Sequence, residues 1–156
     1  MLKISRKAST VLSMVLSVLL FALIAAGAVG MPWLTDLFLG MPGNPNRADI
    51  SAGERAFILV AAYGALAAAA AADLAVFFIL RSVYAGQVFT GRVVSLLRLV
   101  SWCCFAFAGF FVLLTYHFVL AAAVAFCAVF VGIITRVVKN AFEEAVALKN
   151  ENDFTI

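Results

Sequence analysis

The 156 residues of this chain have room for one domain, and their composition indicates a membrane protein. Hydrophobic residues make up 66% of the chain and charged residues only 12%, whereas a soluble domain is about half apolar and about a quarter charged. The formal net charge of +3 is too small to indicate nucleic-acid binding by itself. The composition therefore excludes an ordinary soluble domain and favours an integral membrane protein.

Four apolar stretches are long enough to cross a bilayer, which takes about 20 consecutive apolar residues in a helix. The first covers about 10–30, and the second covers about 56–80 with Asp73 as its one interruption. The apolar run from 93 to 138 is too long for one helix and fits two, about 95–114 and 119–138, joined by a tight turn at 115–117. We expect an all-α fold, an integral membrane four-helix bundle in which residues 1–156 form a single membrane domain.

The first stretch has a second interpretation. Lys3, Arg6 and Lys7 precede the apolar run and the small residues AAGAVG follow within it, as in a cleaved signal peptide. The run is longer than the apolar part of a usual signal peptide, and no secreted domain follows. A retained first helix is therefore favoured.

The segment that follows, from Trp33 to the second stretch, is expected to be a loop because the three prolines of the chain fall at its start or within it. Ser51 and Glu54 have the spacing of a capping box, in which each side chain bonds to the backbone of the other residue. The second helix is therefore expected to begin near Ala52.

Basic residues are distributed unequally between the two sides of the expected bundle. Only Arg47 and Arg55 belong to the first loop, beside three acidic residues. The other nine belong to the two termini and the second loop: Lys3, Arg6, Lys7, Arg81, Arg92, Arg98, Arg136, Lys139 and Lys149. Cytoplasmic segments of membrane proteins are enriched in Lys and Arg, so both termini and the second loop are expected to face the cytoplasm.

Asp73 is the most conspicuous residue within an expected span. An ionised carboxylate in lipid costs several kcal/mol unless it faces a partner. Arg98 lies at a comparable depth near the start of the third span, so we expect an Asp73–Arg98 contact that holds the second and third helices together. Two alternatives stay open: Arg98 extends to the headgroups while Asp73 is protonated or bonded to backbone, or Asp73 lies on a proton or cation pathway.

Patterns typical of enzymes and metal sites do not occur. The chain has no HExxH, GxSxG or Walker motif, and the adjacent Glu143 and Glu144 point in different directions on a helix. Cys103, Cys104 and Cys127 lie in apolar runs without the spacing of a metal site. We expect no enzyme activity and no metal or other cofactor. A Cys103–Cys104 disulfide, or acylation, stays open.

The expected cytoplasmic side carries two distinctive segments. In 86–102, Thr90 is placed to cap a helix that begins amphipathic and then enters the bilayer. In 136–156, the fourth helix is expected to leave the membrane as a C-terminal cytoplasmic helical extension, with Phe142 and Leu148 on an apolar stripe, and to stop at 150–153.

That apolar stripe needs a cover, for which the bilayer surface, the 81–92 loop, a second copy of the chain or a partner protein are candidates. Residues 136–153 hold three cations and four anions, a balance that does not suit anionic lipid. A protein surface is therefore favoured.

The same two segments resemble the bacterial membrane-protein family catalogued as domain of unknown function 2975. Members show a Phe-Thr pair, then a valine and a Leu-Arg pair before the third span, and they end in Leu-Lys, two polar residues and Asn-Asp-aliphatic-Thr-aliphatic. Gly91 and Ser95 depart from the first pattern. The residues that match are Phe89, Thr90, Val94, Leu97 and Arg98 in the first segment and Leu148, Lys149, Asn152, Asp153, Thr155 and Ile156 in the second.

The resemblance implies a four-span protein of the bacterial inner membrane, of a kind often encoded beside small helix-turn-helix regulators. It implies that the chain binds and sequesters or modulates such a regulator, without binding nucleic acid directly. A small transporter or channel subunit that uses Asp73, a structural subunit of a membrane assembly, and a homo-oligomer stay open. The residues expected to contact the partner are Phe89, Thr90, Val94, Leu97, Phe142, Leu148, Lys149, Asn152, Asp153, Thr155 and Ile156.

Overall fold

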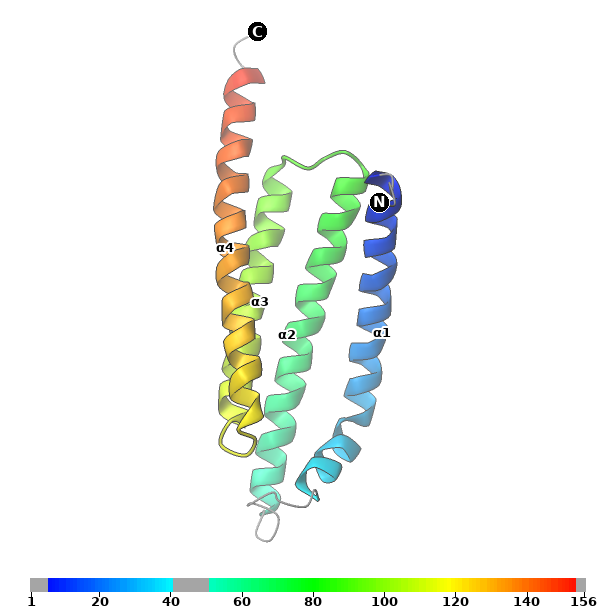
Figure 1. The fold of residues 1–156 in the computed structure, drawn as a ribbon, viewed down its shortest axis with the longest axis vertical. Coiled ribbons are helices and arrows are strands. Elements are labelled where there is room, and N and C mark those ends of the chain that lie inside the picture. Colours follow the sequence, from blue (N-terminus) through cyan, green and yellow to red (C-terminus); the bar gives the residue numbers. More distant parts are fainter. Residues whose placement is uncertain (1–5, 41–50, 154–156) are drawn as a thin grey trace, which may run out of the picture.

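The computed structural model describes residues 6–40 and 51–153, and these ranges contain four helices and no strand. The helices are α1 (Arg6–Leu39), α2 (Ala52–Tyr84), α3 (Gly91–Leu114) and α4 (Leu120–Asp153). They lie side by side and alternate in direction (Figure 1). The predicted all-α four-helix architecture is confirmed. We call the end where α1 and α3 begin and α2 and α4 end the upper end, as drawn in Figure 1.

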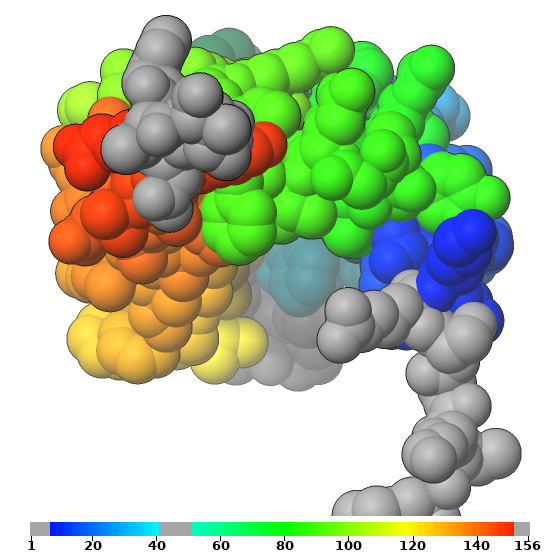
Figure 2. All heavy atoms as spheres, turned by 90° about the horizontal axis from the view of Figure 1, so that it is seen from above, coloured from blue at the N-terminus to red at the C-terminus, as the bar shows by residue number. Residues whose placement is uncertain are grey.

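Each helix packs against its neighbours in the sequence, α1 on α2, α2 on α3 and α3 on α4. Within the described residues, α1 and α4 do not approach each other in this way. The bundle is therefore open on one side, and the view from above shows a hollow between the edges that α1 and α4 form (Figure 2).

All four helices are long and apolar enough to cross a membrane. Large apolar side chains are exposed along them, among them Leu23 at 68%, Val29 at 86% and Phe126 at 72%. Exposed apolar surface on this scale marks a protein that is covered by lipid or by another chain. The predicted spans are thus present, and the helices that contain them are longer than predicted.

The segment after Trp33 was predicted to be a loop, and this prediction is wrong for its first part. α1 continues through Pro32 to Leu39. Proline has no N–H, so the carbonyl of Ala28 loses its helical donor. The hydroxyl of Tyr63 on α2 donates to that carbonyl at 3.1 Å, which is how a neighbouring helix lets a membrane helix tolerate proline. α1 bends at this level (Figure 1).

We predict that Tyr63→Phe destabilises the protein by about 1 kcal/mol, because the Ala28 carbonyl would be left unpaired between α1 and α2. The control is the same substitution in a Pro32→Ala background, where the restored N–H supplies the missing donor. Melting of the four variants in detergent micelles measures the coupling. An equal cost of Tyr63→Phe in both backgrounds would contradict this account of the bend.

The small residues of α2 allow α3 to approach closely. Ala61 and Ala65 are both 3% exposed, and a Cβ added at Gly64 would lie 2.5 Å from the ring of Phe110. Without a hydrophobic driving force between helices in lipid, such close packing holds membrane helices together. The Ala- and Gly-rich sequence of α2 is therefore a packing surface.

We predict that Gly64→Ala lowers the free energy of unfolding by about 1–3 kcal/mol, the usual cost of overpacking. Gly109→Ala is the matched control, because Gly109 precedes Phe110 in α3 and a Cβ added there meets nothing within 4 Å. Thermal melting of both variants is the measurement. Equal melting temperatures would show that the ring of Phe110 moves aside without cost.

The predicted helix boundaries at the two ends of α2 and α3 are largely confirmed. Ser51 Oγ accepts from the Glu54 N–H at 3.3 Å and the Glu54 carboxylate accepts from the Ser51 N–H at 2.8 Å, so the capping box is present and α2 begins at Ala52. Thr90 occupies the cap position of α3, although its side chain makes no capping hydrogen bond. The turn at 115–117 lies between α3 and α4, as predicted.

Candidate functional site

The two distinctive segments of the sequence meet at the upper end. The ring of Phe89, in the loop between α2 and α3, lies 5.7 Å from the ring of Phe142 on α4, centroid to centroid. Phe89 is 48% exposed and Leu148, further along α4, is 58% exposed. The Phe89–Phe142 contact therefore joins the two segments, and we call these two residues, together with the exposed Leu148 six residues further along α4, the aromatic–Leu148 surface.

α4 rises beyond its partner helix at this end (Figure 1). It has 34 residues, whereas α3 has 24, a difference of about 15 Å at 1.5 Å per residue. The sequence predicted that 150–153 would end the helix, and α4 ends at Asp153, the last of these residues. Polar residues at an exposed helix end do not disturb packing, so the helix does not stop at the first of them.

An arginine marks where the apolar part of α4 ends. The stretch from Leu120 to Thr135 carries no charge and covers about 24 Å, close to the thickness of about 30 Å of a hydrocarbon core. The Arg136 guanidinium then lies 5.6 Å from the ring centre of Trp102, which is 59% exposed. Trp and Arg are typical of the membrane interface. Charged residues then recur along α4 from Arg136 to Asp153.

In this charged part of α4, a small cluster of charged side chains joins α3 to α4. The Glu143 carboxylate lies 2.6 Å from Lys139 Nζ and 3.6 Å from the Arg98 guanidinium. The hydrogen bond from Lys139 and its positive charge lower the pKa of Glu143, and Arg98 adds to this effect. Exposed pairs of this kind contribute little to stability, but they fix the charge pattern beside the Phe89–Phe142 contact.

The structure does not bring Asp73 and Arg98 into an ion pair, so the expected contact is replaced by two others. Asp73, 7% exposed, accepts a hydrogen bond of 2.9 Å from the hydroxyl of Ser17, 6% exposed, and Arg98 pairs with Glu143. The bond at Asp73 links α1 to α2 rather than α2 to α3. The similar depth of the two residues along their helices did not reveal which neighbouring helix each side chain faces. Asp73 faces α1, whereas Arg98 faces α4.

We predict that Ser17→Ala lowers the free energy of unfolding by about 1–2 kcal/mol, because it leaves a buried carboxyl group unpaired. Ser13→Ala is the matched control one turn earlier in α1, since the Ser13 hydroxyl only donates to the Ser9 carbonyl of its own helix. Asp73→Asn retains an acceptor for Ser17 and is expected to be tolerated. A double-mutant cycle that couples Asp73 to Arg98, and not to Ser17, would reverse this conclusion.

The other residues expected to contact a partner differ in their accessibility. Val94 is 6% exposed, so it belongs to the packed interior and presents little surface to a partner. Thr90, Leu97 and Phe142 are half-buried, and Lys149 is exposed. Asn152 and Asp153 belong to α4, whereas Thr155 and Ile156 lie outside the described residues. Fewer residues are therefore accessible to a partner than the sequence motifs contain.

The cysteines do not form a disulfide in this structure. Cys103 is buried, Cys104 is partly buried and Cys127 is exposed, and all three are free.

Four apolar helices with exposed apolar sides and charged ends define a multi-pass α-helical membrane protein. Residues 31–156 match the model of a family described as "Protein of unknown function (DUF2975)", which covers well over half of the chain. The chain belongs to this family, and the resemblance carried by its two C-terminal motifs is confirmed. No match was found among curated proteins or solved structures.

Proposed function

We propose that the aromatic–Leu148 surface binds a small cytoplasmic helix-turn-helix transcription regulator and holds it at the bacterial inner membrane. The observation that carries this proposal is the Phe89–Phe142 contact. It joins two motif segments, far apart in the sequence, into one partly exposed apolar surface on a helix that rises beyond its neighbours (Figure 1).

The charge distribution supports a cytoplasmic position for this surface. Arg81, Arg92, Arg98, Arg136, Lys139 and Lys149 all belong to segments at the upper end of the array. At the lower end Arg55 pairs with Asp36 at 2.9 Å, which offsets its charge. By the positive-inside rule, the upper end faces the cytoplasm, where a soluble regulator would meet it.

The type of partner follows from the family, whose members are often encoded beside such regulators. The proposed mechanism is sequestration: a regulator docked on α4 is kept from DNA or from its dimeric form. A helical partner fits this surface because an exposed apolar stripe on one helix pairs with a similar stripe on another. No catalytic or transport step is proposed, since the Ser17–Asp73 contact accounts for the buried carboxyl group.

We predict that Leu148→Glu reduces recovery of the neighbouring regulator by at least about tenfold, because it places a charge on an exposed apolar residue of the proposed interface. Ala147→Glu is the matched control: Ala147 is also exposed, and it lies about 100° around α4 from Leu148 and about 180° from Val138. Co-purification of the regulator with the full-length protein from membranes is the measurement.

Equal recovery with Leu148→Glu and with the unaltered chain would refute capture by this surface. Equal loss with both variants would indicate a general charge effect and would also count against it. A chain that ends at Lys139, provided that it still inserts, should recover no regulator.

A further inference from the structure

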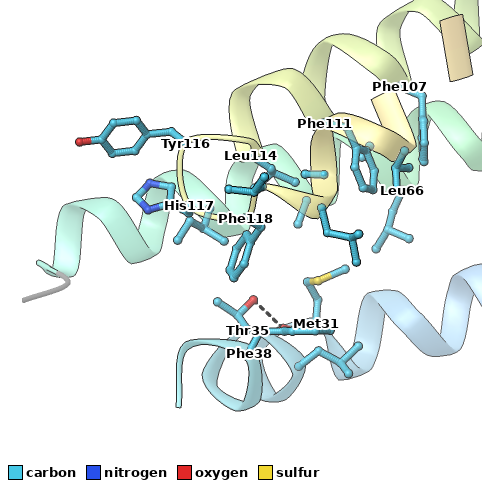
Figure 3. Close-up of a pocket in the computed structure, with 18 residues that line it drawn as sticks. Met31, Thr35, Phe38, Leu66, Phe107, Phe111, Leu114, Tyr116, His117 and Phe118 are labelled. Carbon is cyan, nitrogen blue, oxygen red and sulfur yellow. Dashed lines mark hydrogen bonds between the residues drawn. The ribbon is translucent and has the colours of Figure 1, made fainter. Parts of the chain in front are cut away.

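A cavity of about 750 Å³ lies at the lower end of the array, far from the aromatic–Leu148 surface. All four helices line it. Figure 3 shows Phe111, Leu114 and Phe118 on one side and Met31, Thr35 and Phe38 of α1 on the other. The volume lies within the range of about 300–1,000 Å³ that is typical of small-molecule sites.

The bend of α1 shapes this cavity. After Pro32, the last turns of α1 carry Phe38 to 6.1 Å from the ring of Phe118 in the turn between α3 and α4, centroid to centroid. Within the described residues α1 and α4 do not pack on each other, so no contact between these two edge helices closes the cavity on that side.

The dimensions and lining of the cavity match a hydrocarbon chain. Along α3 it extends from Phe107 to Leu114, about 10 Å at 1.5 Å per residue, which approaches the depth of one leaflet of a core about 30 Å thick. The described lining contains no charged side chain. A peptide or a nucleotide would leave its polar groups unpaired there.

One buried polar side chain at the edge of the lining has an unpaired atom. His117 is 9% exposed and its Nδ1 atom has no hydrogen-bond partner in the part of the chain that the structure describes. The Thr35 hydroxyl is already used, because it donates to the Met31 carbonyl at 2.9 Å (Figure 3). A buried polar atom without a partner is rare in folded proteins and indicates a missing ligand or solvent group.

We infer that this cavity binds one long acyl chain, whose polar end hydrogen-bonds to His117. The chain belongs to a free fatty acid or to a phospholipid of the surrounding bilayer, and both have the required chemistry. This site stands apart from the proposed regulator surface, so the failure of one leaves the other intact.

The test uses the full-length protein in phosphatidylglycerol nanodiscs with a photoactivatable palmitic acid. In a second arm, a phospholipid carries the same photoactivatable chain. We expect adducts to concentrate between Phe107 and Val124, and Val124→Trp to reduce them about tenfold by filling the cavity. Val129→Trp is the matched control, since Val129 lies on the same helix, is 37% exposed against 38% for Val124, and does not line the cavity.

A second variant examines the polar atom. His117→Phe keeps a ring beside Phe57 and Phe118 but removes Nδ1, and is expected to weaken capture about fivefold, the loss of one hydrogen bond. Melting temperatures close to that of the unaltered protein confirm that each variant folds. Should Val124→Trp unfold, competition of the label by unlabelled palmitate in the unaltered protein takes its place.

Competition by free palmitate assigns the chain to a fatty acid, and labelling from the phospholipid arm that palmitate does not reduce assigns it to the bilayer. Both results support the site. Adducts spread evenly over the four helices, or equal labelling of Val124→Trp and the unaltered protein, would overturn it. Labelling that falls as the number of protein copies per nanodisc rises would assign the cavity to a second copy of the chain. That result would also overturn the proposed acyl-chain site.

Discussion

Close contact between consecutive helices is the constraint on which the rest of this structure depends. Helices in lipid gain little from the hydrophobic effect and are held by packing and hydrogen bonds. Gly64 accepts the ring of Phe110 between α2 and α3, and a Cβ added at Gly132 would lie 3.2 Å from the Cβ of Cys104 between α3 and α4. These glycines set the spacing of the array and, through it, the position of Phe89 over Phe142.

Polar groups within the apolar part of the array form bonds between the same consecutive helices. Ser17 donates to Asp73, Tyr63 donates to the Ala28 carbonyl, and Ser101 donates to the Gly132 carbonyl at 3.0 Å. The ion pairs, in contrast, lie at the two ends, where water and headgroups solvate the charges. The interior is thus specified by neutral donors and small side chains, and the ends by charges.

The sequence predicted what depends on local chemistry. Apolar length predicted four helices, the Ser51–Glu54 spacing predicted the start of α2, and the C-terminal motif predicted the family. The features that it did not predict depend on the rotation of one helix against another. The continuation of α1 through Pro32 is supported by a hydrogen bond from Tyr63 of α2, and the partner of Asp73 depends on which face of α2 carries it. The same limit applies to Val94, whose motif position gave no sign that it is buried.

The Ser17–Asp73 bond also has a consequence for the order in which the chain enters the bilayer. Ser17 precedes Asp73 by 56 residues, and chains are synthesised from the N-terminus. When α2 leaves the translocon, α1 has therefore already entered the membrane, and the Ser17 hydroxyl is present to donate to the Asp73 carboxyl group. Direction of synthesis, rather than a charged neighbour, lets this helix enter the lipid with a hydrogen-bond partner for its Asp73 carboxyl group.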